Sequence, residues 1–344
     1  MRKRIISGIL GATLAATVLA GCGSSSSSSS ASSTTADSAA AQTTESAPAQ
    51  TTEAAADTAS TEAATTEAST ADTASTEEAA ADDYDFTSDP ITLKIGVVGS
   101  MYEDLWKPAV DTLKDEGITL EVTQFSDYVT PNNALANGEI DLDAFQHRIY
   151  LQSEIDQYGY EITNIGNTFI IPLNVYSDKI KSVDELKDGD TIAVPNDPTN
   201  EGRALKVLAA AGVITLKDND NFNPNLDDIE SYSHDIKIEE LAANTIPSTL
   251  ADVTAAVVNG NYALDFGLKT DDAIYKDTVL DQKEYWNLIA ARTKDLDDPR
   301  LVAAYDKVVK AFQSDATKDV FNNQFGGYFI AVGWDEDLLA DYKK

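Results

Sequence analysis

From residue 91 onward, runs of β-forming residues alternate with stretches in which apolar residues recur at helical spacing. Ile91–Val98 is predicted to be a strand, and the helical stretch that follows it ends at Gly117. Ile118–Phe125 is predicted to be a second strand, and Thr130 with the proline after it begins another helix. This alternation predicts an α/β fold with a parallel sheet that helices cover on both faces.

After this first alternation, the long extended stretch Ile162–Tyr176 leads into a second one. The elements predicted there are a capping box at Ser182–Glu185, strands at Thr191–Pro195, Val253–Val258 and Trp286–Ala291, and helices at Ala204–Ala211 and Arg300–Phe312. The last of these strands is expected to return the chain to its first lobe. We therefore predict two lobes joined by two crossings, with residues 87–174 and 287–344 in the first lobe and residues 175–286 in the second.

The chain begins with a basic head at residues 2–4, followed by the apolar run Ile5–Ala20. A basic head before an apolar run that is too short to span a bilayer is typical of a secretory signal peptide. The run ends in Leu-Ala-Gly-Cys22, which resembles a bacterial lipobox, in which the cysteine is lipidated and becomes the mature N-terminus. Residues 1–21 are therefore predicted to be a lipoprotein signal peptide. We expect a lipid on Cys22 to anchor the protein at the outer face of the cell membrane, and a buried free thiol is the alternative.

Residues 22–86 are nearly all Ser, Thr, Ala, Glu and Asp, without apolar periodicity. Such a segment cannot bury enough apolar surface to offset the entropy of ordering it. The alternative, an alanine-rich helix, is disfavoured because the many Ser and Thr side chains compete for backbone hydrogen bonds. We predict a disordered tether that holds the globular part, from about residue 87, away from a membrane.

The formal net charge of −33 makes nucleic acid and anionic membrane surfaces poor partners, because both are bound through basic patches. The single cysteine excludes an intrachain disulfide and a zinc site built from several cysteines. The sequence contains no nucleophile elbow, P-loop or dinucleotide fingerprint, and its two histidines are far apart. We therefore predict no catalytic residue, no cofactor and no metal, with a metal site at His147 and Asp141 or Asp143 as the alternative.

Residues 141–150 are predicted to form a short buried strand, a loop and the start of a helix. Ligands of open α/β sheets bind outside the carboxyl ends of the strands. Phe145, His147 and Tyr150, together with Tyr128, are therefore candidates for enclosing an apolar ligand side chain such as a thioether. Ordinary packing of these rings is the alternative.

Asn200 and Arg203 lie just before the helix predicted from Ala204. Unpaired N–H groups at a helix N-terminus, with a guanidinium one turn along, favour a carboxylate. The alternative is a surface ion pair of Arg203 with Asp197 or Glu201.

Asn259 and Asn287 lie at the end of one predicted strand and within another. A buried amide can accept a hydrogen bond from an ammonium and donate one to a carboxylate, whereas an exposed asparagine more often forms a turn. The sequence therefore predicts that one lobe binds the charged end of a small molecule and that the other lobe encloses its apolar end.

Several longer motifs follow one another through the globular part. They are Phe125–Asn132, Gly138–Asp141 with Ala144–His147 and Tyr150, Gly166–Phe169, Val194–Asn200 with Gly202-Arg203, and Tyr285–Arg292. Together they closely resemble the methionine-binding lipoproteins of ABC importers, the NlpA-type lipoproteins. The similarity covers essentially everything after the tether.

The resemblance implies a two-lobed fold of the periplasmic-binding-protein type (type II) that binds methionine or a small peptide containing it. It also implies delivery of this ligand to a membrane permease driven by a cytoplasmic ATPase. Ligand contact is carried over to Tyr128, Phe145, His147 and Tyr150 for the ligand side chain, and to Asn200, Arg203, Asn259 and Asn287 for its amino-acid backbone.

Some segments depart from the family's pattern. His147–Tyr150 replaces the usual lysine and proline, and the loop Gly99–Asp104 and the segment after Asn259 differ from their common forms. These departures leave L-methionine, D-methionine and a short peptide ending in methionine as candidate ligands. The sequence is also compatible with a receptor for another amino acid or a metal ion, with a lyase or hydrolase on the same scaffold, and with an adhesin that has no pocket.

Overall fold

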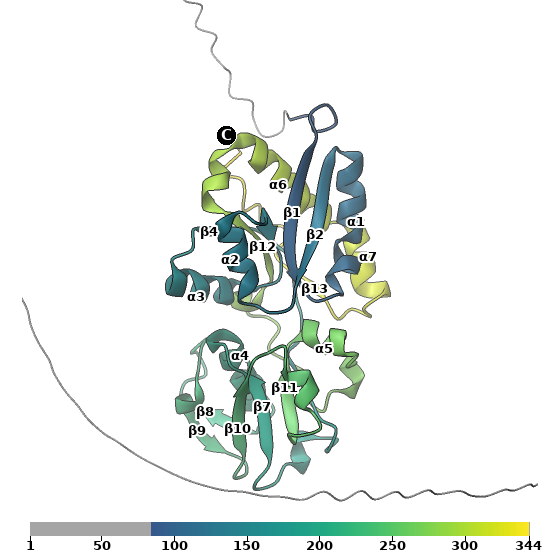
Figure 1. Cartoon of the computed structure of the whole chain (residues 1–344). Coiled ribbons are helices and arrows are strands. Elements are labelled where there is room, and N and C mark those ends of the chain that lie inside the picture. The colour runs from purple at the N-terminus through teal and green to yellow at the C-terminus, as the bar shows by residue number, and fades with distance from the viewer. Residues whose placement is uncertain (1–83, 344) are drawn as a thin grey trace, which may run out of the picture. The chain divides into compact units, whose positions relative to one another are not determined.

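The computed structural model describes residues 84–343, and the predicted signal peptide, Cys22 and nearly all of the predicted tether lie outside the described residues. Two sheets organise the described part, one in each lobe (Figure 1). The first-lobe sheet, in the order β2-β1-β3-β12-β4, consists of β1 (Ile91–Val98), β2 (Ile118–Phe125), β3 (Leu142–Asp143), β4 (Ile162–Asn167) and β12 (Leu288–Arg292). The second-lobe sheet, in the order β10-β7-β11-β6, consists of β6 (Asn174–Tyr176), β7 (Thr191–Pro195), β10 (Lys237–Leu241) and β11 (Ala255–Val258).

Both sheets are mixed. In the first lobe, β1 is parallel to β2 and β3, whereas β12 is antiparallel to β3 and β4. In the second lobe, β7 is parallel to β10 and β11, whereas β6 is antiparallel to β11. The prediction of a parallel sheet is therefore wrong for β6 and β12, because these two strands follow the segments that cross between the lobes and enter their sheets from the opposite end.

Helices cover both faces of the first-lobe sheet, as predicted. They are α1 (Tyr102–Asp115), α2 (Thr130–Asn137), α3 (Arg148–Tyr158), α6 (Pro299–Phe312) and α7 (Asp315–Asn323). On β12, Ile289 and Ala291 pack in the same core as α1, α6 and α7, whereas Leu288 and Ala290 pack with α2 and α3. Successive residues of a strand point to opposite faces, which explains why a strand buried on both faces is apolar throughout.

The second lobe repeats this arrangement with α4 (Pro198–Ala210), α5 (Gly260–Phe266) and the 3-10 turn η4 (Ile246–Thr249). On β7, Ile192 and Val194 pack with α4, whereas Ala193 packs with residues of η4 and α5. The cluster around Ala193 also contains Val98 and Phe145 of the first lobe, so the two lobes are in apolar contact.

Short elements complete the described part. They are the antiparallel pairs β5 (Phe169–Ile170) with β13 (Ile330–Ala331) and β8 (Ile214–Leu216) with β9 (Ile229–Tyr232), and the 3-10 turns η2 (Val183–Glu185), η3 (Leu226–Asp228), η5 (Thr270–Asp272), η6 (Lys283–Tyr285) and η7 (Thr293–Asp297). The capping box predicted from Ser182 thus begins only the single turn η2, because a cap marks where a helix starts but not how far it extends.

Two predicted boundaries are wrong. α4 begins at Pro198 rather than at Ala204, because the carboxylate of Asp197 caps it and proline is favoured at a first helical position. The tether was expected to run to Phe86, but this side chain is only 2% exposed and packs in the first-lobe core. The ordered part therefore begins before the apolar run of β1.

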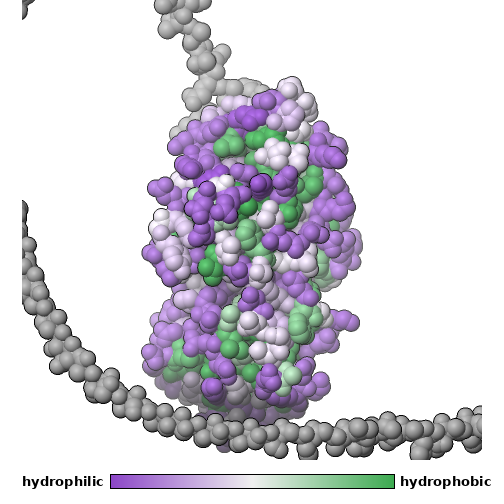
Figure 2. Space-filling view, in the orientation of Figure 1, coloured by the Kyte–Doolittle hydropathy of each residue, from purple (hydrophilic) through white to green (hydrophobic). Residues whose placement is uncertain are grey.

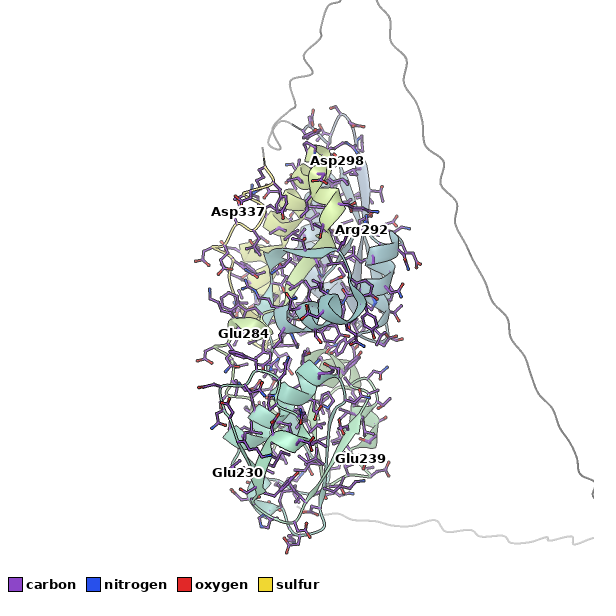
Figure 3. All side chains as sticks on the ribbon, turned by 90° about the vertical axis from the view of Figure 1, so that its left-hand side faces the viewer. Glu230, Glu239, Glu284, Arg292, Asp298 and Asp337 are labelled. Carbon is purple, nitrogen blue, oxygen red and sulfur yellow. The ribbon has the colours of Figure 1, made fainter. Side chains whose placement is uncertain are left out.

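Hydrophilic residues cover most of the face seen in Figure 2, with apolar residues in small groups between them. Figure 3 shows Glu230 and Glu239 on the second lobe, Arg292 and Asp298 on the first, and Glu284 near the level where the lobes meet. Within residues 84–343, no helix has the length and hydrophobicity needed to cross a bilayer.

Candidate functional site

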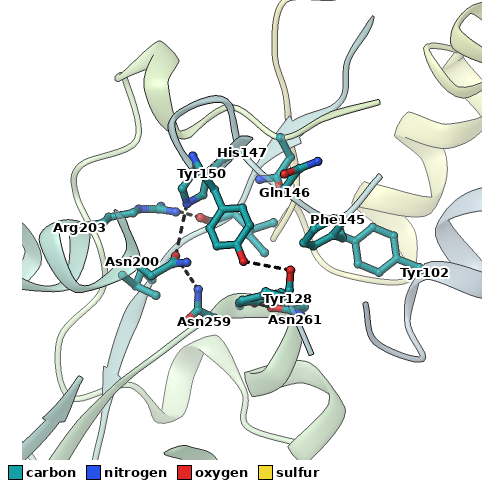
Figure 4. Close-up of a pocket in the computed structure, with 14 residues that line it drawn as sticks. Tyr102, Tyr128, Phe145, Gln146, His147, Tyr150, Asn200, Arg203, Asn259 and Asn261 are labelled. Atoms are coloured by element: carbon teal, nitrogen blue, oxygen red, sulfur yellow. Dashed lines mark hydrogen bonds between the residues drawn. The ribbon is translucent and has the colours of Figure 1, made fainter. Parts of the chain in front are cut away.

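A narrow pocket lies where the two lobes meet, and the centre of a water-sized sphere can occupy about 30 Å³ of it (Figure 4). It is lined by all eight residues to which the resemblance assigns ligand contact, namely Tyr128, Phe145, His147, Tyr150, Asn200, Arg203, Asn259 and Asn287. Six other residues complete the lining, namely Tyr102, Gln146, Ile171, Leu173, Gly260 and Asn261.

Asn200 is oriented by the residue that caps α4. The carboxylate of Asp197 accepts hydrogen bonds from the backbone N of Asn200 at 2.9 Å and from its Nδ2 at 3.1 and 3.0 Å. The Asn200 Oδ1 remains as an acceptor on the other side and binds Nδ2 of Asn259 at 2.8 Å. The prediction of a free N–H at this helix end is therefore wrong for Asn200, because Asp197 already binds it.

Arg203 lies on the second turn of α4 and is buried. Its Nη2 donates to Oδ2 of Asp277 at 2.8 Å and to the carbonyl oxygen of Ile171 at 2.7 Å. The alternative of a surface ion pair with Asp197 or Glu201 is therefore wrong, because the partner is a buried carboxylate far along the chain. Nε of Arg203 is buried and has no hydrogen-bond partner.

The two candidate asparagines lie at strand ends. Asn259 directly follows β11, and its Oδ1 is buried without a hydrogen-bond partner, while its Nδ2 binds Asn200. Asn287 directly precedes β12, forms an antiparallel bridge with His147, and donates its backbone N–H to the carbonyl of Phe169 at 2.8 Å. Both asparagines line the pocket rather than an exposed turn.

His147 joins the two lobes as a neutral ring. It caps α3, because its Nδ1 accepts from the backbone N of Tyr150 at 3.1 Å. In a neutral imidazole with Nδ1 as the acceptor, Nε2 carries the proton, and this atom lies 3.4 Å from Oδ1 of Asn200. Burial and, secondly, the charge of Arg203 lower the pKa of His147 to about 3.

Three rings of the first lobe form the aromatic wall, defined as Tyr128, Phe145 and Tyr150. The rings of Tyr128 and Phe145 are stacked with centroids 6.0 Å apart, and Tyr150 meets Phe145 edge-on at 6.0 Å. The hydroxyl of Tyr150 donates to the carbonyl of Tyr128 at 3.0 Å, and the hydroxyl of Tyr128 donates to Oδ1 of Asn261. Because both hydroxyls are bonded within the protein, the wall offers mainly apolar surface to a ligand.

Gly260 and Asn261 line the pocket but were not predicted to do so. A Cβ on Gly260 would come within 2.7 Å of Cδ1 of Ile171 and 3.0 Å of the hydroxyl of Tyr328, so a larger residue here would require the Ile171 side chain to shift. Nδ2 of Asn261 donates to the carbonyl of Val98 at 3.0 Å and holds α5 against β1. The signal that could have revealed both residues is the Asn-Gly-Asn sequence directly after a strand. Gln146 lies within the stretch predicted at residues 141–150, whereas Tyr102, Ile171 and Leu173 belong to no such motif.

The alternative metal site around His147 is not formed. Oδ2 of Asp141 accepts from the backbone N of Lys94 at 2.8 Å, and Oδ1 of Asp143 accepts from Nε2 of Gln146 at 2.9 Å. Burial raises the pKa of Asp143 to about 8. In the part of the chain that the structure describes, no three His, Cys, Asp or Glu side chains are placed to hold a metal ion.

Two residues of the pocket lining carry a buried donor and a buried acceptor that no protein group satisfies. They are Nε of Arg203 and Oδ1 of Asn259. An unsatisfied buried polar group costs about 1 to 3 kcal/mol, so a bound group that satisfies it gains affinity. A carboxylate suits the guanidinium and an ammonium suits the amide oxygen, so this side of the pocket can accept a zwitterion while the aromatic wall accepts an apolar chain.

Comparison with known proteins extends this description to the whole globular part. The family model described as NlpA lipoprotein matches residues 93–333. The chain is 39% identical over 250 residues to the D-methionine-binding lipoprotein MetQ of Escherichia coli (strain K12), which covers 72% of this chain and 90% of that protein. It is also 39% identical over 244 residues to outer membrane lipoprotein 3 of Mannheimia haemolytica, which covers 70% of this chain and 90% of that protein.

Solved structures of similar proteins have the same fold. A nutrient binding protein from Burkholderia cenocepacia bound to methionine matches with a TM-score of 0.65 and 42% identity, over 70% of this chain and 100% of that chain. The substrate binding protein of a methionine transporter from Streptococcus pneumoniae matches with a TM-score of 0.67 and 34% identity, over 70% of this chain and 96% of that chain. The predicted two-lobed α/β fold of the periplasmic-binding-protein type is confirmed, and the chain belongs to the NlpA lipoprotein family.

Proposed function

We propose that this protein captures methionine outside the cytoplasm and delivers it to the permease of an ABC importer. The membership of the NlpA lipoprotein family supports this role, as do relatives named for methionine binding and a similar structure bound to methionine. The eight residues predicted to contact the ligand are proposed to do so from the two sides of the pocket.

The observation that carries this proposal is the pair of unsatisfied buried atoms in the pocket. Nε of Arg203 would donate to the ligand carboxylate, and Oδ1 of Asn259 would accept from the ligand ammonium. A free amino acid supplies both groups on one carbon, so a single small molecule satisfies both atoms.

The aromatic wall supports a ligand with an apolar, polarizable side chain. Tyr128 and Phe145 present ring surface, and Tyr150 meets Phe145 edge-on. Sulfur contacts with aromatic rings contribute about 0.3 to 1.5 kcal/mol, in addition to the burial of the side chain. A thioether therefore gains more in this pocket than a methyl group of alanine does.

We also propose that the protein binds its ligand without altering it. Burial lowers the pKa of His147 to about 3 and raises the pKa values of Tyr128 and Tyr150 above their usual range. None of these three groups is poised to exchange a proton near neutral pH, as a general acid or base needs.

The anchor and the partners complete the proposal. Cys22 lies outside the described residues, and its place in the lipobox-like sequence, together with the lipoprotein names of the relatives, supports lipidation at the outer face of the cell membrane. Metabolic labelling with a palmitate analogue is expected to mark the wild-type chain and to leave Cys22→Ser unmarked. The permease and its cytoplasmic ATPase are the proposed partners.

Titration calorimetry of the full chain with L-methionine, D-methionine, a methionine-containing dipeptide and alanine tests the function. We expect one methionine per chain, with alanine bound about 10-fold to 100-fold more weakly because its side chain buries far less apolar surface. If none of the three methionine compounds binds, the proposal is overturned. A chemically altered amino acid after incubation would support a lyase or hydrolase instead.

A further inference from the structure

The carboxylate that pairs with Arg203 lies behind the pocket and not in its lining. Asp277 follows α5 on the segment that returns to the first lobe, and its side chain has no exposed surface. Its Oδ2 accepts from Nη2 of Arg203 at 2.8 Å and from the backbone N of Leu173 at 3.0 Å. Its Oδ1 accepts from the backbone N of Val279 at 2.7 Å. Three donors therefore hold this buried carboxylate in one orientation.

The ion pair connects α4 with both segments that run between the lobes. Leu173 lies on the first of these segments, whereas Asp277 and Val279 lie on the second. Nη2 of Arg203 also donates to the carbonyl of Ile171 at 2.7 Å. Nη2 of the guanidinium is thus bound by the protein, whereas Nε is buried and has no hydrogen-bond partner in the protein.

Asp277 also sets the charge of the pocket. Arg203 is the one lining residue that carries a charge, because the histidine and tyrosines of the lining are neutral at physiological pH. With Asp277 behind it, the guanidinium and the carboxylate cancel. This pair therefore adds no net charge to the pocket, where the buried carboxylate of Asp197 is already bonded to Asn200, and it suits a ligand that carries both signs.

We propose that Asp277 is a positioning and specificity-determining residue. It fixes the orientation of the Arg203 guanidinium and makes the pocket select a zwitterion over a singly charged anion. The selection follows from the cost of an unbalanced buried charge. If Asp277 loses its charge, the pocket becomes cationic, which attracts a lone carboxylate and repels an ammonium. The proposal deepens the proposed function and rests on it, because it presumes an amino-acid ligand.

Titration of the wild type and of Asp277→Asn with two probes tests this. The probes are methionine and 4-(methylthio)butanoate, which keeps the thioether and the carboxylate but lacks the ammonium. We expect the wild type to bind methionine more tightly than the analogue. In Asp277→Asn, the ratio of the two affinities should fall by about 10-fold to 100-fold, which is the effect expected from removing a unit charge a few ångströms away in a partly buried site. An equal loss for both probes, with an unchanged preference, would mean that Asp277 is merely structural and would overturn the proposal.

Two further variants separate charge from folding. Asp277→Glu keeps the charge and is expected to keep the preference for methionine even where both affinities fall. Asp271 lies on the same segment, and its exposed carboxylate pairs with Lys276 at 2.8 Å. The control Asp271→Asn removes this carboxylate and is expected to leave the preference for methionine unchanged. If Asp277→Asn does not fold, a lost preference in Asp277→Glu overturns the proposal.

Binding of the two probes to the wild type distinguishes a failure of this inference from a failure of the proposed function. If the wild type binds both probes equally well, the inference about Asp277 fails while methionine binding stands. If it binds neither methionine nor its analogue, the proposed function fails first.

Discussion

The two walls of the pocket differ in whether their polar groups are satisfied. In the aromatic wall, the hydroxyls of Tyr128 and Tyr150 are both bonded within the protein. On the opposite wall, Nε of Arg203 and Oδ1 of Asn259 are buried and unbonded. The first wall is therefore complete without a ligand, whereas the second keeps two unsatisfied atoms that we propose the carboxylate and the ammonium of a ligand to satisfy.

This difference separates affinity for the side chain from recognition of the amino-acid backbone. The apolar wall gains from any side chain of suitable size, because burial of apolar surface is not directional. The polar wall gains only from groups of the right charge and geometry, because an unsatisfied buried polar atom remains costly. Substitutions on the two walls are therefore expected to act on different parts of the ligand.

Arg203→Ala should have the largest effect, because it removes the guanidinium and leaves Asp277 buried without its cationic partner. Removing one partner of a charge pair that is buried between a protein and its ligand costs about 2 to 5 kcal/mol, so the lost contact with the ligand carboxylate should make methionine bind roughly 100-fold more weakly in calorimetry. The matched control is Arg300→Ala, whose partner Asp89 is largely exposed, and it should leave binding unchanged. Wild-type affinity in Arg203→Ala would show that the carboxylate binds elsewhere.

Phe145→Ala should weaken methionine binding by about 1.5 to 3 kcal/mol, because it removes apolar surface from the aromatic wall only. The binding of alanine should change much less, so the ratio of the two affinities measures this wall by itself. Phe266→Ala, which removes a ring that is 55% exposed, is the control and should have no effect. Equal losses for both amino acids would contradict the division between the walls.

Asp143→Asn tests the support beneath the aromatic wall, where Asp143 accepts from Gln146 of the pocket lining. Burial raises the pKa of folded Asp143 from 3.8 to about 8, so the folded state binds more protons than the unfolded state between these values. The wild type should therefore lose stability as pH rises from about 4 to 8. Urea unfolding should show Asp143→Asn to gain stability relative to the wild type by about 1.4 kcal/mol per pH unit from pH 5 to pH 8, or roughly 4 kcal/mol in all.

The control for this pH effect is Asp111→Asn, which removes an exposed carboxylate from the surface pair with Lys107. The difference in free energy of unfolding between this variant and the wild type should be the same at pH 5 and pH 9. The same change with pH in both variants would assign the effect to general charge and not to the buried Asp143.

Glu336→Gln should have the smallest effect. Glu336 accepts from Arg148 at 2.8 Å and from Lys283 at 2.9 Å, near the segment that carries Asn287. These hydrogen bonds lower the pKa of Glu336 to about 2. Its contribution to folding stability is therefore present above pH 4.5 and is lost as the pH falls toward 2. Because the group is partly exposed, thermal unfolding at pH 7 should show a loss of at most about 1 kcal/mol. The exposed control Glu239→Gln should show none.

Local patterns in the sequence were sufficient for most strands, for some of the helix starts and for the candidate residues. The residues that enclose the pocket stand directly after strands or at helix starts, as Phe145, Asn200 and Asn259 do, and such positions can be read from short stretches. All eight candidates line one pocket, although their contact with a ligand stays a prediction. Tyr102, Ile171 and Leu173 carry no such local signal and were not found.

The sequence by itself determined the alternation of strands and helices, because burial on both faces of a sheet requires apolar runs that local periodicity reveals. Only the tertiary structure decided the direction of β12, the pairing of Arg203 with Asp277 and the two buried polar atoms left without a partner. Asp277 lies 74 residues after Arg203, and no local pattern states which carboxylate a buried guanidinium will meet. Strand direction and buried pairing depend on how distant segments meet, and they appear only once the two lobes are folded together.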